Sequence, residues 1–265
     1  MNGELINNIR YADDTVILAS DVNELQQLVE RVRVVSEQYG LKLNVEKSKW
    51  MRVSKRPHQW EQLIIGKKSV EQVNKYSYLG SFVSSDWDQS MGIKTRIKKA
   101  RTAFNNMKPL FTSRDLSINL KYRLAKCYIF SILLYGVEAW TMTERLMKKL
   151  EAFELWVYRR ILRIPWTDHI TNEEVLRRLD KHREILFTVK KRKMEYFGHI
   201  MRHEKYRLLQ LIIQGKTDSK RGPGRRRHSW LHSLRQWYGL TTIQLFRSAA
   251  NKIRIAMLIA NVRTG

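Results

Sequence analysis

The chain has 265 residues, 43% of them hydrophobic, and a formal net charge of +25. This length and composition predict a soluble, globular protein with one large domain or two smaller ones. The single cysteine, Cys127, excludes an internal disulfide and a cysteine-rich zinc knuckle, which fits a protein of the nucleus or cytoplasm. We expect its side chain in the core. No apolar stretch approaches the roughly 20 residues of a membrane-spanning helix.

The charge is unevenly distributed along the chain. Residues 1–90 contain twelve Lys and Arg against twelve Asp and Glu, whereas residues 91–265 contain 38 against 13. A neutral segment followed by a strongly basic one favours a nucleic acid as the partner of the C-terminal two-thirds. A polybasic protein at a membrane surface has the same asymmetry, and that alternative stays open.

The first predicted element is a β-hairpin around residues 11–14, which read Tyr-Ala-Asp-Asp between two short apolar runs. It places Asp13 and Asp14 together at the bend. Neighbouring carboxylates repel each other, and a hard cation such as Mg²⁺ relieves that repulsion because it prefers oxygen ligands. Two such ions serve phosphoryl transfer by clamping the attacking and leaving oxygens. The alternative for an isolated pair of this kind is a solvated turn.

A helix and further strands follow. Asp21 and Glu24 predict a capping box, and the helix that it opens ends at Gly40. Apolar residues then recur at the spacing of strands. The strands are predicted at residues 41–45, 50–53 and 63–65, and a second hairpin at residues 73–84.

From Met91 the apolar spacing becomes that of long helices. The first helix has one apolar face, and its other faces carry cations that include Lys94, Lys98 and Arg101. The last helix is expected to turn Ile243, Phe246, Ala250 and Ile253 inward. The helices after the first are predicted at residues 117–135, 143–164, 171–179, 183–203, 230–237 and 241–262.

A basic tether is predicted between two of these helices, because Gly222, Pro223 and Gly224 disfavour a helix there. Its cations suggest phosphate contacts or a nuclear-import signal, and the alternative is a solvated loop. They include Arg225, Arg226 and Arg227. His199 and His203 lie four residues apart on a helix, but a zinc site is not expected because no third ligand is evident.

The chain resembles the reverse transcriptases of non-LTR retrotransposons of the LINE type. Tyr-Ala-Asp-Asp followed by an apolar strand is similar to their metal-binding hairpin. Three further blocks follow in the family's order. Residues 40–49 resemble the segment that closes the palm, residues 76–80 resemble the hairpin that grips the primer end, and residues 134–140 with 164–168 resemble a region beyond the palm in RTE-type elements.

The resemblance implies roles for individual residues. Asp13 would coordinate both metals and Asp14 would support the site, as catalytic residues. Lys47 would protonate the departing pyrophosphate. The sequence alone is equally consistent with Lys47 as an exposed surface lysine without a catalytic role. The residues expected to contact primer or other nucleic acid are Tyr11, Tyr78, Leu79, Gly80, Lys94, Lys98, Arg101, Arg225, Arg226 and Arg227. Without the resemblance, Tyr78 is an ordinary strand aromatic.

The predicted fold class is α+β, an incomplete reverse-transcriptase palm followed by a mainly helical, basic region. The palm, with both hairpins, occupies residues 1–90. The segments after it are a thumb-like region at 91–165, a basic helical region at 166–213, a flexible basic linker at 214–229 and C-terminal helices at 230–265.

Three hypotheses follow for function. The first is a C-terminal fragment of an RNA-directed DNA polymerase that uses an RNA template, a DNA primer and dNTPs. The family places a further catalytic aspartate and the fingers before this hairpin, so we expect a two-metal site for Mg²⁺ or Mn²⁺ only in the complete enzyme, and no polymerisation by this chain alone. The second is a nucleic-acid-binding helical protein derived from a mobile element, and the third a non-functional, decayed copy. No membrane and no disulfide partner is expected.

Overall fold

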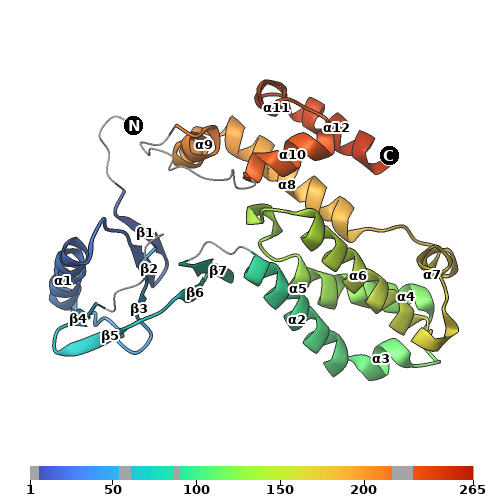
Figure 1. The fold of residues 1–265 in the computed structure, drawn as a ribbon, viewed down its shortest axis with the longest axis horizontal. Helices are drawn as coiled ribbons and strands as arrows, with labels where there is room; N and C mark the ends of the chain where they lie inside the picture. Colours follow the sequence, from blue (N-terminus) through green and yellow to red (C-terminus); the bar gives the residue numbers. More distant parts are fainter. Residues whose placement is uncertain (1–5, 54–60, 86–89, 217–228, 265) are drawn as a thin grey trace. The chain divides into compact units, whose positions relative to one another are not determined.

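The described β-strands lie in the first third of the protein with one helix, and the remainder is helical, so the fold class is α+β, as predicted (Figure 1). The computed structural model describes residues 6–53, 61–85, 90–216 and 229–264. The chain divides into two units, which we call the N-terminal unit (Met1–Asp88) and the helical unit (Gln89–Gly265). Within the described ranges, no helix has both the length and the apolar character needed to span a membrane.

The described part of the N-terminal unit contains three small sheets and one helix. Strands β1 and β2 form an antiparallel hairpin, and β6 and β7 form another. The third sheet has the order β3-β5-β4, with β3 parallel and β4 antiparallel to the central strand β5. The elements are β1 (Asn8–Tyr11), β2 (Asp14–Ile17), α1 (Val22–Gln38), β3 (Lys49–Trp50), β4 (Leu63–Ile65), β5 (Lys68–Gln72), β6 (Lys75–Tyr78) and β7 (Ser81–Ser84).

The Gln26 side chain of helix α1 forms two hydrogen bonds to the three-stranded sheet. The Gln26 amide nitrogen donates to the Ile64 carbonyl oxygen at 2.7 Å, and the Ile64 N–H donates to Gln26 Oε1 at 2.8 Å. These bonds satisfy backbone groups of β4, which lies at the edge of its sheet and would otherwise need water or another strand. The buried core of the unit consists of Val29, Trp50, Leu63, Ile65 and Val70.

The start of α1 differs in one detail from the predicted capping box. Asp21 Oδ1 accepts the Glu24 N–H at 2.8 Å, as expected of an N-cap. The Glu24 carboxylate accepts the N–H and the hydroxyl of Ser20 at 2.8 and 2.5 Å, one residue before the N-cap. These hydrogen bonds hold the pKa of Glu24 below its usual value. The helix ends before Gly40, which has a positive φ of 74°.

Two strand predictions in this unit are wrong or too long. Residues 41–45 form no strand, because Asn44 Oδ1 accepts the Lys47 N–H at 3.1 Å and the backbone turns. Asparagine side chains compete with strand ladders in this way. The strand predicted at residues 50–53 is the two-residue strand Lys49–Trp50.

The helical unit is built from helices of very different lengths. The helix predicted from residue 117 is confirmed as one continuous stretch with a π-helical turn in the middle, and Cys127 on that turn is exposed, not buried as predicted. The elements are α2 (Ser90–Asn106), α3 (Lys108–Thr112), α4 (Ile118–Leu124), the π-helix η1 (Ala125–Phe130), α5 (Ser131–Leu133), α6 (Glu144–Ile161), α7 (Asn172–Leu179), α8 (Ile185–Arg202), α9 (Arg207–Gln214), α10 (Trp230–Tyr238), α11 (Thr242–Ala249) and α12 (Lys252–Thr264), with 3-10 turns η2 (Val137–Ala139), η3 (Trp166–Asp168) and η4 (Glu204–Tyr206).

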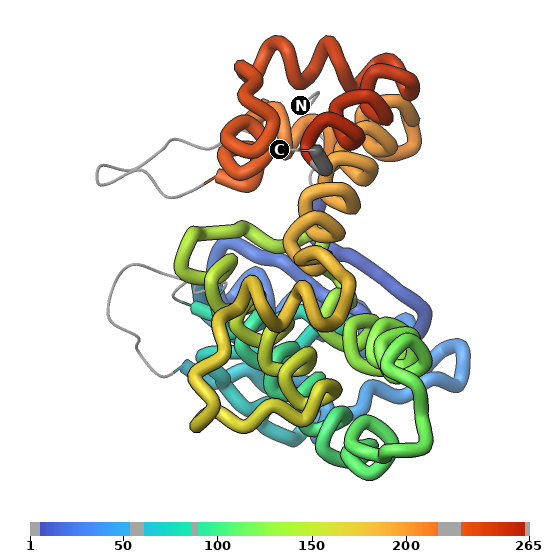
Figure 2. Tube along the Cα trace, turned by 90° about the vertical axis from the view of Figure 1, so that its right-hand side faces the viewer, coloured from blue at the N-terminus to red at the C-terminus, as the bar shows by residue number. Residues whose placement is uncertain are grey.

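Helix α8 joins the two hydrophobic cores of this unit. Ile185 and Val189, in its first half, pack into the larger core with α2, α4 and α6. Met194 and Phe197, in its second half, pack into the smaller core with α10, α11 and α12. Figure 2 shows α8 running from the first group of helices to the second. One amphipathic helix therefore holds both halves of the unit together.

The last predicted helix is in fact two. Asn251 Oδ1 accepts the Ile253 N–H at 2.8 Å and so caps α12 separately from α11. The break changes which residues face inward, and the predicted Ile243 and Ile253 are 64% and 71% exposed. Ala250, also predicted to face inward, is exposed at the break, and Phe246 is partly buried against the smaller core.

Candidate metal-binding hairpin and nucleic-acid interface

The β1–β2 hairpin forms where the sequence predicts it. Tyr11 pairs with Asp14 at the end of the ladder, so Ala12 and Asp13 make a two-residue turn. Ala12 has a φ of 51°, in the left-handed region that costs an L-residue about 1–2 kcal/mol. Tyr11 is 64% exposed. Strained tips of this kind persist where the surrounding structure holds them, and they cluster at functional sites.

The two carboxylates at the tip are open to solvent. Asp13 lies in the turn and Asp14 is the first residue of β2, and both are exposed. Within the described part of the chain, no hydrogen bond or ion pair engages either side chain. Hard oxygen donors in this state suit Mg²⁺ or Mn²⁺. No third His, Cys, Asp or Glu of the described residues completes a metal cluster, so the tip offers part of a metal site.

Lys47 lies on the turn that Asn44 closes, and its side chain is exposed. Among the described residues, no hydrogen bond or ion pair joins its ammonium group to Asp13 or Asp14. Lys47 is therefore an exposed side chain that no described contact orients toward the acidic tip.

The second hairpin, β6–β7, has a tight turn at Leu79 and Gly80. Tyr78 pairs with Ser81, and the two residues between them have φ values of 47° and 80°. Positive φ at both positions is typical of a type I′ turn. Leu79 is 41% exposed, whereas the Tyr78 hydroxyl is buried without a partner among the described residues. The tip thus presents Leu79, and not the Tyr78 hydroxyl, to a ligand.

The three predicted cations of the helical unit share a face of α2. Lys94, Lys98 and Arg101 are spaced by four and three residues, so they lie on one side of a helix. All three are exposed, and within the described ranges none of them forms an ion pair. Such a row of unpaired cations is suited to a polyanion.

Sequence reasoning missed two residues beside this face. Trp156 of α6 lies under the Arg101 guanidinium, with the Arg101 Cζ 4.8 Å from the ring centroid. Arg160 covers the same ring, with its Cζ at 3.9 Å. The four-residue spacing from Trp156 to Arg160 on a helix was a usable signal for their contact. The approach of Arg101 was not, because it depends on how α2 packs on α6.

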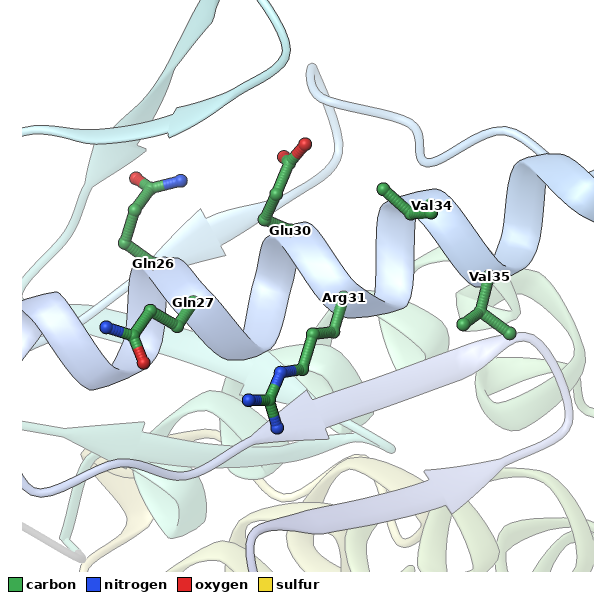
Figure 3. A pocket seen from close by; sticks show the side chains of 6 residues that line it. All are labelled: Gln26, Gln27, Glu30, Arg31, Val34 and Val35. Carbon is green, nitrogen blue, oxygen red and sulfur yellow. The ribbon is translucent and has the colours of Figure 1, made fainter.

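The remaining predicted cations, Arg225, Arg226 and Arg227, lie outside the described residues. A hollow of about 650 Å³ along α1 carries no site (Figure 3). All six residues that line it belong to this one helix, and they include Val34 and Val35 at 42% and 51% exposure. Side chains of a single helix do not enclose a small ligand.

Comparisons with known proteins match both parts of the chain. Residues 3–83 match the family described as reverse transcriptase (RNA-dependent DNA polymerase). This segment contains the β1–β2 hairpin, the turn of Lys47 and the β6–β7 hairpin up to Val83. Over 244 residues, the chain is 28% identical to a putative uncharacterized transposon-derived protein of Caenorhabditis elegans, with 89% of this chain and 86% of that protein covered. No solved structure matches the chain.

Proposed function

We propose that this reverse-transcriptase-like protein, a relative of a transposon-derived protein, serves RNA-directed DNA synthesis by a LINE-type, RTE-like retrotransposon. The observation that carries the proposal is the exposed, unpaired pair Asp13 and Asp14 at a strained hairpin tip, inside the segment that matches the reverse transcriptase family. The hairpin supplies two carboxylates to a nucleotidyl-transfer site, and the helical unit holds the nucleic acid.

In this proposal Asp13 and Asp14 bind Mg²⁺ or Mn²⁺ through their carboxylate oxygens. When bound, two such ions stabilise the attacking and leaving oxygens of the transfer. The short β1–β2 ladder fixes the backbone that carries both acids, with Asp13 in the turn and Asp14 at the start of β2. Because the described residues add no third acid, further ligands have to come from a segment outside them or from another chain. We therefore expect this chain alone not to extend a primer.

The primer and the template have separate proposed contacts. The β6–β7 tip offers the exposed Leu79 to the primer end, with Gly80 beside it in the turn as the second proposed contact. The face of α2 with Lys94, Lys98 and Arg101 contacts the phosphate backbone of an RNA template or DNA primer. A role for Lys47 as proton donor to pyrophosphate stays a prediction, because its exposed side chain makes no contact that orients it.

Metal binding by the isolated chain tests the role of the tip. Titration of Mn²⁺ followed by electron paramagnetic resonance should detect a weak site in the wild type. Asp13→Asn and Asp14→Asn should each weaken it, since a neutral amide replaces a charged ligand. Asp21→Asn is the matched control, because asparagine also caps helices and the hairpin is untouched. Equal Mn²⁺ binding in all four proteins would contradict the proposed ligands.

Primer extension tests the proposed dependence on further ligands. With a primed RNA template, dNTPs and either metal, the purified chain should give no extension. Extension that Asp13→Asn abolishes would establish the catalytic role and would show that the chain needs no further ligand. Extension that persists in Asp13→Asn and Asp14→Asn would refute the catalytic role.

A second candidate function is nucleic-acid binding without catalysis. The observation that favours it is the charge of residues 91–265, where 38 Lys and Arg face 13 Asp and Glu. This basic segment has its own cores and does not depend on the hairpin. In that case nucleic-acid affinity should fall steeply with salt and should be the same in Asp13→Asn and the wild type. Affinity that does not change with salt would contradict both functions.

A further inference from the structure

Two arginines share one tryptophan ring in the helical unit. Arg160 lies one helical turn after Trp156 on α6, and its Cζ is 3.9 Å from the centroid of the indole. Arg101 reaches the same indole from α2, which packs against α6, and its Cζ is 4.8 Å from the centroid. Both arginines are exposed, and Trp156 is half-buried. The arrangement places two cationic planes at one point of the surface.

The tryptophan is held firmly from below. Its ring stacks on Phe153 at 5.6 Å with an interplanar angle of 17°, and it meets the edge of Phe104 at 5.0 Å and 65°. Phe104 in turn stacks on Phe111 at 4.5 Å. The three phenylalanines are at most 2% exposed. A ring fixed in a core limits the orientations of the guanidinium groups stacked on it, which lowers the entropy cost of using them to bind a ligand.

The two arginines lack the counter-charge that others in this chain have. Arg33 pairs with Glu30 and Glu37, and Arg177 pairs with Glu174. In the described part of the chain, neither Arg101 nor Arg160 forms an ion pair. Partial burial and the nearby Arg101 charge lower the pKa of Arg160. Two like charges on one ring repel each other, and an anion bound between them removes that cost.

We propose that Arg101 and Arg160, stacked on Trp156, form a binding site for a phosphate of the nucleic-acid backbone. The planar guanidinium presents several donors in a fork that matches phosphate oxygens, and stacking leaves its edge free to donate. Lys94 and Lys98 continue the row from Arg101 along α2. A row of about 10 Å, at 1.5 Å per residue, suits a polymer of phosphates more than one small anion. The choice of ligand rests on the proposed function.

Binding of labelled single-stranded DNA and of an RNA–DNA duplex to the full chain, followed by fluorescence anisotropy in a salt series, tests this site. Arg101→Gln and Arg160→Gln should each weaken binding about fivefold near physiological salt and lower the slope of log affinity against log salt by about one. Arg177→Gln is the control, because it removes the same charge from the same unit where Glu174 pairs with it. It should change affinity less than about twofold.

The double substitution to lysine separates geometry from charge. Arg101→Lys with Arg160→Lys keeps both charges and should keep the salt slope, but it should lose affinity because the planar forks are gone. Nucleic-acid binding that both glutamine variants leave unchanged would overturn this site and leave the proposed function standing. Absence of nucleic-acid binding by the wild type would instead contradict the proposed function.

Inorganic phosphate distinguishes a site for the nucleic-acid backbone from a site for a free phosphate ion. For a backbone site, a millimolar phosphate addition should neither raise the melting temperature nor compete with the oligonucleotide. A phosphate-induced rise that both glutamine variants lose, without nucleic-acid binding, would assign the same residues to a free anion and overturn the nucleic-acid part of the proposal. Circular dichroism of each variant should match the wild type, since both arginine side chains are exposed.

Discussion

The two units differ in what holds them together. Among the described residues, the core of the N-terminal unit contains five buried side chains, whereas the helical unit has clusters of 23 and seven. The N-terminal unit compensates with local devices: the Asp21 cap, the Gln26 bridge and two tight turns. A unit with so small a core displays most of its polar groups to solvent, and its acidic tip is one of them.

This difference in packing also distinguishes the acidic hairpin tip from the arginine pair on Trp156. Asp13 in the turn and Asp14 at the start of β2 are both exposed, and no third acid of the described residues joins them, so a partner has to complete that site. Arg101 and Arg160 stand on a tryptophan fixed in a core, so their geometry exists before a ligand arrives. We expect changes in the helical unit to act through packing, and changes in the N-terminal unit through turns and caps.

Phe104→Ala should have the largest effect. The ring is fully buried and contacts Phe111 and Trp156, so its loss leaves a cavity and should destabilise the helical unit by about 4 kcal/mol. Urea unfolding followed by far-UV circular dichroism reports this unit, because all helices but α1 belong to it. Leu120→Ala on α4 of the same unit, at 40% exposure, is the control and should cost less than about 0.5 kcal/mol. Equal costs would break the comparison.

Lys193 should make the stability of the helical unit depend on pH. Its side chain is fully buried, donates to the Trp140 carbonyl oxygen and lies 4.2 Å from the Trp230 ring. Burial lowers the pKa of Lys193 from 10.5 to about 7. The folded pKa is the lower one, so stability is greatest above the unfolded pKa and falls as pH decreases through the interval down to about 7.

The expected slope is about 1.4 kcal/mol per pH unit near pH 9 and about half of that at pH 7, or roughly 2 kcal/mol between pH 7 and 9. Lys193→Met should abolish this slope and raise stability at pH 7, and Lys191→Met, an exposed neighbour, should retain it. Urea midpoints at pH 7, 8 and 9 measure it. The buried tyrosines do not interfere there, because burial raises the pKa of Tyr158 and Tyr238. A slope that survives in Lys193→Met would refute the assignment.

Local signals in the sequence predict what local physics decides. Ser117, Thr143 and Thr171 each accept an N–H three residues on, so the starts of these helices follow from residue type and spacing. The hairpin tips follow equally from two short apolar runs around a turn. The break at Asn251 does not, because apolar residues continue at helical spacing on both sides of the asparagine and mask its preference for a cap.

The parts of the candidate sites that depend on tertiary packing were out of reach. Nothing in the sequence states that Arg101 and Arg160 meet on Trp156, since that needs the packing of α2 on α6. The buried Lys193 is a further case. Its position on a basic helix predicts a solvated side chain, and its burial depends on Trp140 and Trp230 from distant segments.

Leu79→Gly should stabilise the β6–β7 hairpin. Glycine adopts a φ of 47° without the strain that leucine bears, whereas it loses more conformational entropy on folding. The relief of strain is the larger effect, so the net stabilisation should be about 0.5–1 kcal/mol. Hydrogen exchange of peptides covering residues 75–84 measures the change. Ser77→Gly, in the middle of β6, is the control and should weaken protection. Lower protection in Leu79→Gly than in the wild type would mean that the Leu79 side chain contributes more than the strain costs.

Trp166→Ala should change stability least. It tests whether the helical unit, like the N-terminal unit, has exposed turns whose side chains contribute little to its stability. Trp166 is 81% exposed on a 3-10 turn of the helical unit. The turn is anchored without it, because Arg159 Nη2 donates to the Ile170 carbonyl oxygen at 2.7 Å. Truncation should therefore change stability by less than about 0.5 kcal/mol.

Trp230→Ala is the matched control for that substitution. The Trp230 indole N–H donates to the Glu138 carbonyl oxygen at 2.8 Å, and its ring carries Lys193, so its loss should cost about 3 kcal/mol. Acrylamide quenching should also fall more in Trp166→Ala than in Trp230→Ala, because the exposed indole is the one that the quencher reaches. If Trp166→Ala lowered the free energy of unfolding about as much as Trp230→Ala, the Trp166 side chain would have to pack in the helical unit. Packing would then stabilise the exposed turn of this unit as well as its helices.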